Sequence, residues 1–104
     1  MNRADILDAA KQCITVDRAA THGEAERNFS MVAMYWSAHL DLKITAHDVA
    51  VMMTLFKLAR MKSNPEHVDS ATDAAGYSAI AGEIGSEAHI PKPTPIKPLR
   101  EGAL

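Results

Sequence analysis

Residues 44–65 read ITAHDVAVMMTLFKLARMKSNP, and this stretch predicts a helix at the centre of the fold. Thr45 is a candidate N-cap, and Asp48 stands three residues later, at the spacing of a capping box. The residues that follow are apolar nearly all round, which is typical of a helix covered on every side. The helix should end before Pro65, because the residue preceding a proline avoids the α conformation.

Apolar residues recur at helical spacing in three other segments of the chain. This periodicity predicts helices at about residues 3–16, 24–41 and 66–84. No segment alternates apolar and polar residues as a strand would. The sequence therefore predicts an all-α fold, a compact bundle of about four helices.

The last predicted helix has candidate signals at both ends. Asn64 is expected to cap its start, Pro65 to stand in its first turn and Gly85 to follow its end. Residues 86–104 then carry four of the five prolines, a composition typical of an extended polyproline-type tail. A helical domain over residues 1–85 with an extended Pro-rich C-terminal tail is the predicted organisation.

Composition limits the classes of function. A chain of 104 residues is expected to form one domain with a modest core, so self-association into a homo-oligomer would supplement its stability. A net charge of -2 argues against a general nucleic-acid binder or a membrane-surface binder.

Cysteine content and hydropathy limit the compartment. The single cysteine, Cys13, excludes an internal disulfide framework and is expected to be a small buried residue. No apolar run approaches the ~18 residues of a membrane span, and the N-terminus lacks the apolar core of a signal peptide. A bacterial cytoplasm is therefore the expected location.

The sequence DSATDAAGY, residues 69–77, places two carboxylates and a tyrosine at one-turn intervals along a predicted helix. Asp69, Asp73 and Tyr77 share one stripe, and the like charges of the two aspartates repel each other at this spacing. Hard cations such as Mg²⁺ take oxygen ligands, often one or two carboxylates plus substrate phosphates. The stripe is a candidate catalytic and metal site, and a solvent-facing acidic surface is the alternative.

Lys57 and Arg60 stand three residues apart in the apolar helix and share one face. One interpretation is that both cations bind phosphate groups in a polar groove. The other is structural, since a cation in apolar surroundings needs a partner and Asp69 and Asp73 are near in sequence. Both interpretations place these acids opposite the two cations.

A third candidate is the segment DRAATHGEAERNF, residues 17–29, which leads into a helix. Arg18 is a candidate phosphate ligand, and Glu24 and Asn28 are four residues apart and could face one groove. Glu24 and Asp48 are added as candidate Mg²⁺ ligands. The five histidines follow no zinc-binding spacing, so a zinc site is not expected.

The order of these landmarks resembles a family of short tailed-phage and prophage proteins of unknown function. The shared pattern is DR–x3–HG–x4–NF, YWSAHL, ITAHDVAVMM, FKLAR and H–x–DSATDAAGY. It covers about residues 5–84, and His22 stands where the family typically has tyrosine. The resemblance implies a phage or prophage source and supplies no function.

A fold-level likeness to the MazG-like all-α nucleoside triphosphate pyrophosphohydrolases is weaker. Those enzymes hold Mg²⁺ with Glu and Asp from two antiparallel helices, and Asp69 and Asp73 look like half of such a site. Their acids are typically spaced ExxE and ExxD, whereas Glu24 and Glu26 are two apart here and the two aspartates are four apart. Catalysis by analogy with these enzymes rests on fold alone.

Two functions follow from these observations. The first is a Mg²⁺-dependent nucleotide or phosphate-ligand site, either a binder or a pyrophosphohydrolase. The second is a non-enzymatic interaction protein that binds and inhibits a host or defence protein, with the Pro-rich tail as a docking segment. The sequence leaves open whether the protein is an enzyme.

Overall fold

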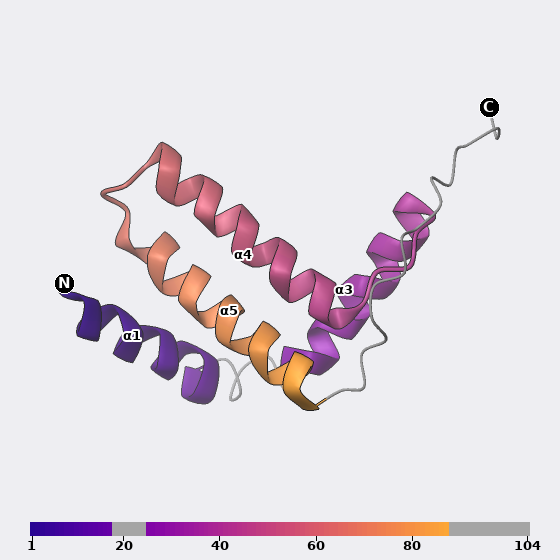
Figure 1. Ribbon diagram of the computed structural model, residues 1–104, viewed down its shortest axis with the longest axis horizontal. Coiled ribbons are helices and arrows are strands. Elements are labelled where there is room, and N and C mark those ends of the chain that lie inside the picture. The colour runs from indigo at the N-terminus through magenta and orange to yellow at the C-terminus, as the bar shows by residue number, and fades with distance from the viewer. Residues whose placement is uncertain (18–24, 88–104) are drawn as a thin grey trace.

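The computed structural model describes residues 1–17 and 25–87, and within these ranges the chain is helical with no strand. This confirms the predicted all-α class. The Pro-rich tail and residues 18–24 lie outside the described residues. None of the described helices is long and apolar enough to cross a membrane. The elements, shown in Figure 1, are α1 (Arg3–Gln12), the π-helical turn η1 (Cys13–Asp17), α3 (Ala25–Leu40), α4 (Ala46–Ser63) and α5 (Val68–Glu87).

The start of α4 is fixed by side-chain hydrogen bonds on both sides. The Asp48 backbone N–H donates to Thr45 Oγ1 at 3.1 Å, and the Thr45 N–H donates to Asp48 Oδ2 at 2.9 Å, which confirms the predicted capping box. Just before it, the Ser37 hydroxyl accepts from the Ile44 N–H at 2.8 Å and donates to the Ile44 carbonyl at 3.2 Å. These bonds hold the end of α3 and the start of α4 together across their connecting loop.

The turn between α4 and α5 differs from the predicted one. Asn64 ends α4, because its N–H donates to the Arg60 carbonyl at 2.8 Å, and its own carbonyl accepts from the His67 N–H at 3.1 Å. The predictions that Asn64 caps the next helix and that Pro65 stands in its first turn are therefore wrong. A separate turn precedes α5, which begins only at Val68.

Two other predicted helix boundaries are also wrong. The fourth helix was expected to end before Gly85, but α5 continues through Glu87, where the Ser86 hydroxyl donates to the Glu83 carbonyl at 2.9 Å. The first helix changes to a π-helical turn at Cys13, where the sequence predicted regular helix. Cys13 is also exposed, so the prediction that it is buried is wrong.

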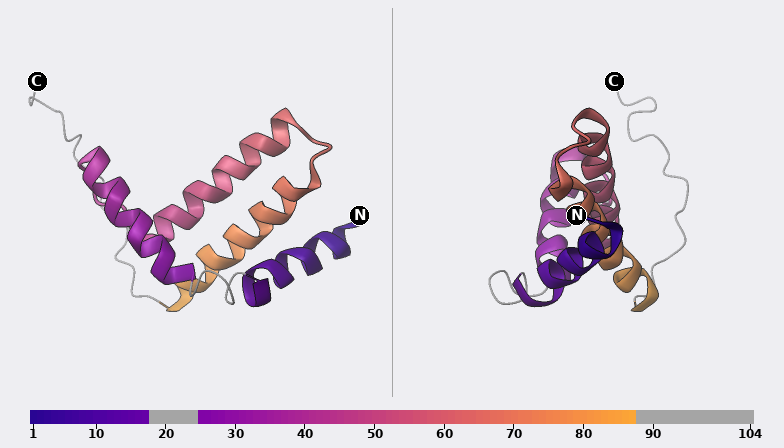
Figure 2. Two further views of the ribbon diagram at one scale, coloured as in Figure 1. Left: turned by 180° about the vertical axis from the view of Figure 1, so that it is seen from behind. Right: turned by 90° about the vertical axis from the view of Figure 1, so that its left-hand side faces the viewer.

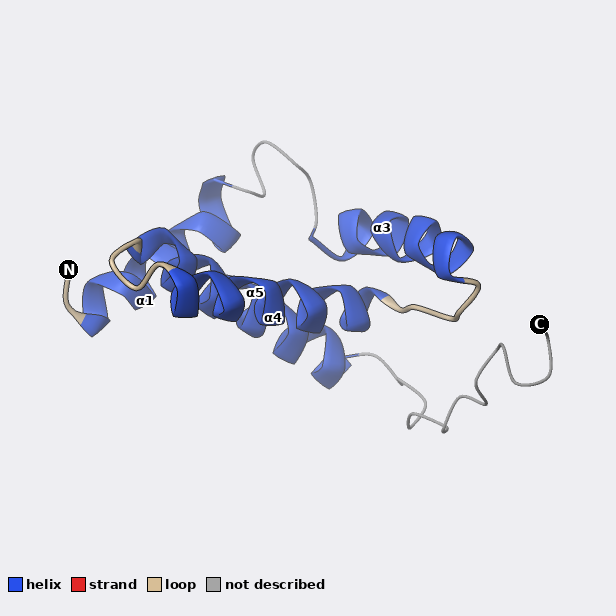
Figure 3. Cartoon of the chain, turned by 90° about the horizontal axis from the view of Figure 1, so that it is seen from above, coloured by secondary structure: helices blue, strands red, loops and turns tan. Residues whose placement is uncertain are grey.

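The helices α4 and α5 form an antiparallel hairpin, with α1 lying along α5 and α3 crossing the end where α4 begins (Figure 1). The view from behind in Figure 2 shows α3 diverging from this hairpin, and the view from above in Figure 3 shows α3 displaced to one side of it. Six residues of α5 are buried, compared with two of α4. The prediction that α4 is covered on every side is therefore wrong, and α5 is the most enclosed helix described.

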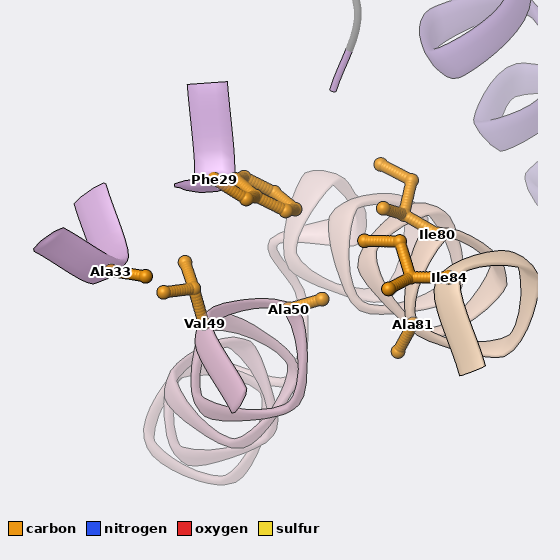
Figure 4. Packing of buried hydrophobic residues seen from close by; sticks show 7 residues of the cluster. All are labelled: Phe29, Ala33, Val49, Ala50, Ile80, Ala81 and Ile84. Atoms are coloured by element: carbon orange, nitrogen blue, oxygen red, sulfur yellow. The ribbon is translucent and has the colours of Figure 1, made fainter. Parts of the chain in front are cut away.

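The apolar core lies where α3 crosses the hairpin (Figure 4). Its large members are Phe29 from α3 and Val49 from α4, which face Ile80 and Ile84 from α5. Alanines fill the remaining positions, so the helices approach closely but bury little area per residue. The buried cluster consists of Phe29, Ala33, Val49, Ala50, Ile80, Ala81 and Ile84.

Glycine at position 76 lets the first helical segment approach α5. A Cβ atom built on Gly76 would lie 3.0 Å from Ile14 Cγ2, whereas one built on Gly82 would have no neighbouring atom within 4 Å. The segment that packs closely against Gly76 is therefore η1, through Ile14.

Alanine substitutions at Gly76 and Gly82 should have different effects on stability. Gly82→Ala should raise the free energy of unfolding by about 0.5–1 kcal/mol, because alanine favours helix over glycine. The free energy of unfolding of Gly76→Ala should be at least about 1 kcal/mol lower than that of Gly82→Ala, because the added methyl group crowds Ile14. Urea denaturation measures both. Equal effects would contradict the close packing, and an Ile14→Leu background, which removes Cγ2, should reduce the difference.

Candidate functional site

The centre of the candidate site is an ion pair between α4 and α5. Lys57 Nζ lies 2.9 Å from Asp73 Oδ2, and the two side chains are 19% and 36% exposed. The antiparallel hairpin places them opposite each other, so the predicted pairing of helix cations with helix acids is confirmed for these two residues. Lys57 Nζ also lies 5.6 Å from the centre of the Phe56 ring. The pair is partly buried and still open to solvent on one side.

The neighbouring predicted residues Asp69 and Arg60 are not part of this pair. Asp69 lies one turn before Asp73 with its side chain 84% exposed, and its Oδ2 is 3.9 Å from His67 Nε2. Arg60 is exposed in the last turn of α4. The structure therefore brings Lys57 and Asp73 into contact and leaves Asp69 and Arg60 on the open surface nearby.

A small hollow lies beside the ion pair, between η1 and α5. Its volume is about 30 Å³, enough for an ion or a water molecule and far below that of a nucleotide. Tyr77 faces this hollow, and its ring centre lies 5.9 Å from that of Phe29, which ties it to the core. The lining residues are Cys13, Ile14, Thr72, Asp73, Gly76, Tyr77 and Ile80.

Cys13, Ile14 and Thr72 were not predicted as site residues. Cys13 and Ile14 reach the hollow because Gly76 allows η1 to pack closely on α5, and Thr72 lines it from α5 itself. In the sequence, a glycine within a helical pattern was the one available sign of this approach, and it does not identify the packing partner.

The remaining predicted metal and ligand residues are dispersed. Asp48 is in the capping box of α4 and, nine residues before Lys57, lies about 14 Å from it along the helix axis. Asn28 is partly buried in α3, and Arg18 and Glu24 lie outside the described residues. Among residues 1–17 and 25–87, no three His, Cys, Asp or Glu residues gather as a metal-binding group. Asp69 and Asp73 remain adjacent carboxylates on one helix.

Comparison with known proteins places the chain in a phage context. A family model described as a domain of unknown function, DUF6378, matches residues 5–85. The chain is 40% identical over 76 residues to the Gene 55 protein of Mycobacterium phage L5 and 38% identical over 82 residues to that of Mycobacterium phage D29. These alignments cover 72% and 79% of the chain but 49% and 54% of the relatives, so it spans about half their length. No solved structure matches the chain significantly.

The ion pair makes a prediction about stability without ligand. Asp73→Asn should lower the free energy of unfolding by about 1 kcal/mol in metal-free buffer, because the Lys57 ammonium loses its partner. Asp69→Asn should change it by less than about 0.5 kcal/mol, because that side chain is exposed. Lys57→Met should recover part of the loss in a double-mutant cycle measured by urea denaturation. A gain on Asp73→Asn would contradict a structural role for the pair.

Proposed function

The chain belongs to the DUF6378 family, and we propose that it binds a phosphate-containing ligand, a nucleotide in the leading case, with Mg²⁺. The observation that carries this proposal is the contact of 2.9 Å between Lys57 Nζ and Asp73 Oδ2 at the rim of the hollow. A cation for phosphate oxygens and a carboxylate for Mg²⁺ therefore lie side by side on two facing helices.

The partial exposure of the pair supports this assignment. With 19% of its side chain exposed, Lys57 can turn from Asp73 to a phosphate oxygen and keep a charge-assisted hydrogen bond. Asp73 is then free to coordinate a cation. Without ligand, Lys57 and Asp73 pair with each other and stabilise the fold. With ligand bound, a phosphate oxygen replaces Asp73 as the partner of Lys57, and the cation replaces Lys57 as the partner of Asp73.

The carboxylates fit Mg²⁺ held together with phosphates rather than a cage built by the protein alone. Mg²⁺ keeps several waters and is commonly bound by one or two carboxylates plus substrate phosphates. Asp73 and the exposed Asp69, one turn apart on α5, would hold the ion. Glu24 and Asp48 remain predictions as further Mg²⁺ ligands, and Asp48 lies far along α4 from Lys57 and Asp73. When bound, Mg²⁺ neutralises charge on the phosphoryl oxygens.

The small hollow indicates which part of the ligand is bound most closely. At about 30 Å³ it accommodates an ion, a water or one phosphate oxygen, so a nucleoside would lie outside it. Arg60, exposed one turn beyond Lys57, is suited to a more distal phosphate, and the Tyr77 ring borders the hollow. Arg18 and Asn28 stay predictions as further ligand contacts. Recognition would therefore depend on the phosphates more than on the base.

A hydrolytic form of the proposal follows the likeness to MazG-like enzymes. Asp69, being exposed, would orient the attacking water by accepting its hydrogen bond, while Asp73 would hold the Mg²⁺ ion beside the phosphoryl group. The water oxygen would bond to the phosphorus as the bond from phosphorus to the pyrophosphate leaving group breaks. Lys57 would neutralise the negative charge that develops on the phosphoryl oxygens. Binding without hydrolysis requires the same Lys57 and Asp73 contacts but no oriented water. Catalytic turnover therefore distinguishes a hydrolase from a protein that only binds the ligand.

Calorimetric titration with nucleotides and with tripolyphosphate, with and without Mg²⁺, tests the proposal. Binding should require Mg²⁺, and Lys57→Met and Asp73→Asn should each weaken it at least about tenfold, the loss expected for one charged contact. Asp8→Asn, on the exposed surface of α1, is the matched control and should bind as the unaltered chain does.

A pyrophosphate-release assay on the same variants distinguishes an enzyme from a binder. Release that depends on Mg²⁺ and that falls by a larger factor than the affinity does in Asp69→Asn would support hydrolysis. No binding and no release across the common nucleotides would overturn the proposal and favour the alternative, an interaction protein that inhibits a host or defence protein.

A further inference from the structure

Helix α4 has a second apolar face that no described part of the chain covers. Val51, Leu55 and Leu58 are 38%, 58% and 46% exposed, and they lie at the i, i+4, i+7 spacing of one helical stripe. Met52 and Phe56 widen this stripe and are 39% and 51% exposed. A helix that is apolar on both sides is normally covered on both sides.

Helix α3 adds a second exposed stripe. Met31, Met34 and Tyr35 are 54%, 63% and 67% exposed and share the face of α3 opposite the buried Phe29 and Ala33. Figures 1 and 2 show that α3 diverges from the hairpin, and this stripe, opposite the core that α3 shares with α4, lies on a different side of the fold from the α4 stripe. Methionine and tyrosine are also enriched at protein interfaces.

The core inside one chain is correspondingly small. Five of the nine buried hydrophobic residues of the described ranges are alanines, namely Ala10, Ala33, Ala50, Ala74 and Ala81. Domains of this size often need association to supplement such a core. Apart from Phe29 and Val49, most of the large apolar side chains of α3 and α4 are exposed instead of filling this core.

We propose that a second copy of this chain covers the exposed face of α4, forming a two-fold dimer in which the α4 helices pack antiparallel. The five exposed side chains of this face offer on the order of 80 Å² each, or roughly 400 Å² per chain, which is the size of a small interface and predicts a weak dimer. A two-fold axis pairs the face with itself, and homodimer interfaces are the more apolar class. The surface comprises Val51, Met52, Leu55, Phe56 and Leu58.

The charges at the ends of the α4 stripe favour a second copy over an unrelated protein. Asp48 and Lys62 stand seven residues to either side of Leu55 and share its helix face. If two α4 helices cross antiparallel at Leu55, Asp48 of each chain faces Lys62 of the partner subunit. The same sequence thus supplies both halves of a complementary surface, with an apolar centre and oppositely charged ends.

Sedimentation equilibrium of the full chain tests the dimer. The unaltered chain should be dimeric at concentrations of hundreds of micromolar, and Leu55→Ala should raise the dissociation constant at least tenfold. Lys62→Glu should raise it at least threefold, because it places a second carboxylate near Asp48. Leu7→Ala, at a side chain 62% exposed on α1, is the matched control and should change it less than twofold.

Three outcomes would overturn the inference. They are a monomer at all concentrations up to the millimolar range, a dimer weakened equally by Leu55→Ala and Leu7→Ala, and a monomer that dimerises only after removal of residues 88–104. The last would mean that the chain's own tail covers this surface. Circular dichroism shows whether Leu55→Ala keeps its helicity. If it does not, the dissociation constant of Lys62→Glu serves as the test, and an unchanged value would overturn the inference. The inference is independent of the proposed phosphate site.

Discussion

The packing of α4 against α5 determines most of this structure. Small buried residues of α5, Ser70, Ala74 and Ala81, allow the two helix axes to approach closely over the length of the hairpin. This approach sets Lys57 opposite Asp73 and creates the partly buried ion pair. A larger residue on this face of α5 would separate the helices and with them the two charges.

The same helix also organises the side of the fold away from α4. Because Gly76 has no side chain, Ile14 and Cys13 lie directly against α5, and the hollow forms between them, next to Asp73. The candidate site is therefore built by η1 and α4, which both pack on α5. The exposed apolar residues on the outer face of α4 take no part in this arrangement.

Much of the fold could be predicted from the sequence because helical periodicity and capping are local. The four helices, the capping box of Thr45 and Asp48, and a cation–acid pair between α4 and α5 all followed from spacing. Periodicity shows which residues are apolar but not which element covers them, so α4 was wrongly placed at the centre and Cys13 wrongly buried. Whether dispersed acids converge depends on the tertiary arrangement, so Asp48 was proposed as a ligand although it lies far along α4.

In the proposed function, Lys57 and Asp73 serve both the fold and a Mg²⁺–phosphate ligand. Carbon NMR of the aspartate carboxyl groups during titration with Mg²⁺ and tripolyphosphate tests this dual role, since each carboxylate reports its own partner. The Asp73 and Asp69 signals should shift together and saturate at one ligand concentration, while the Asp8 signal stays in place. Unchanged Asp73 and Asp69 signals at millimolar ligand, or equal shifts of every aspartate, would contradict it.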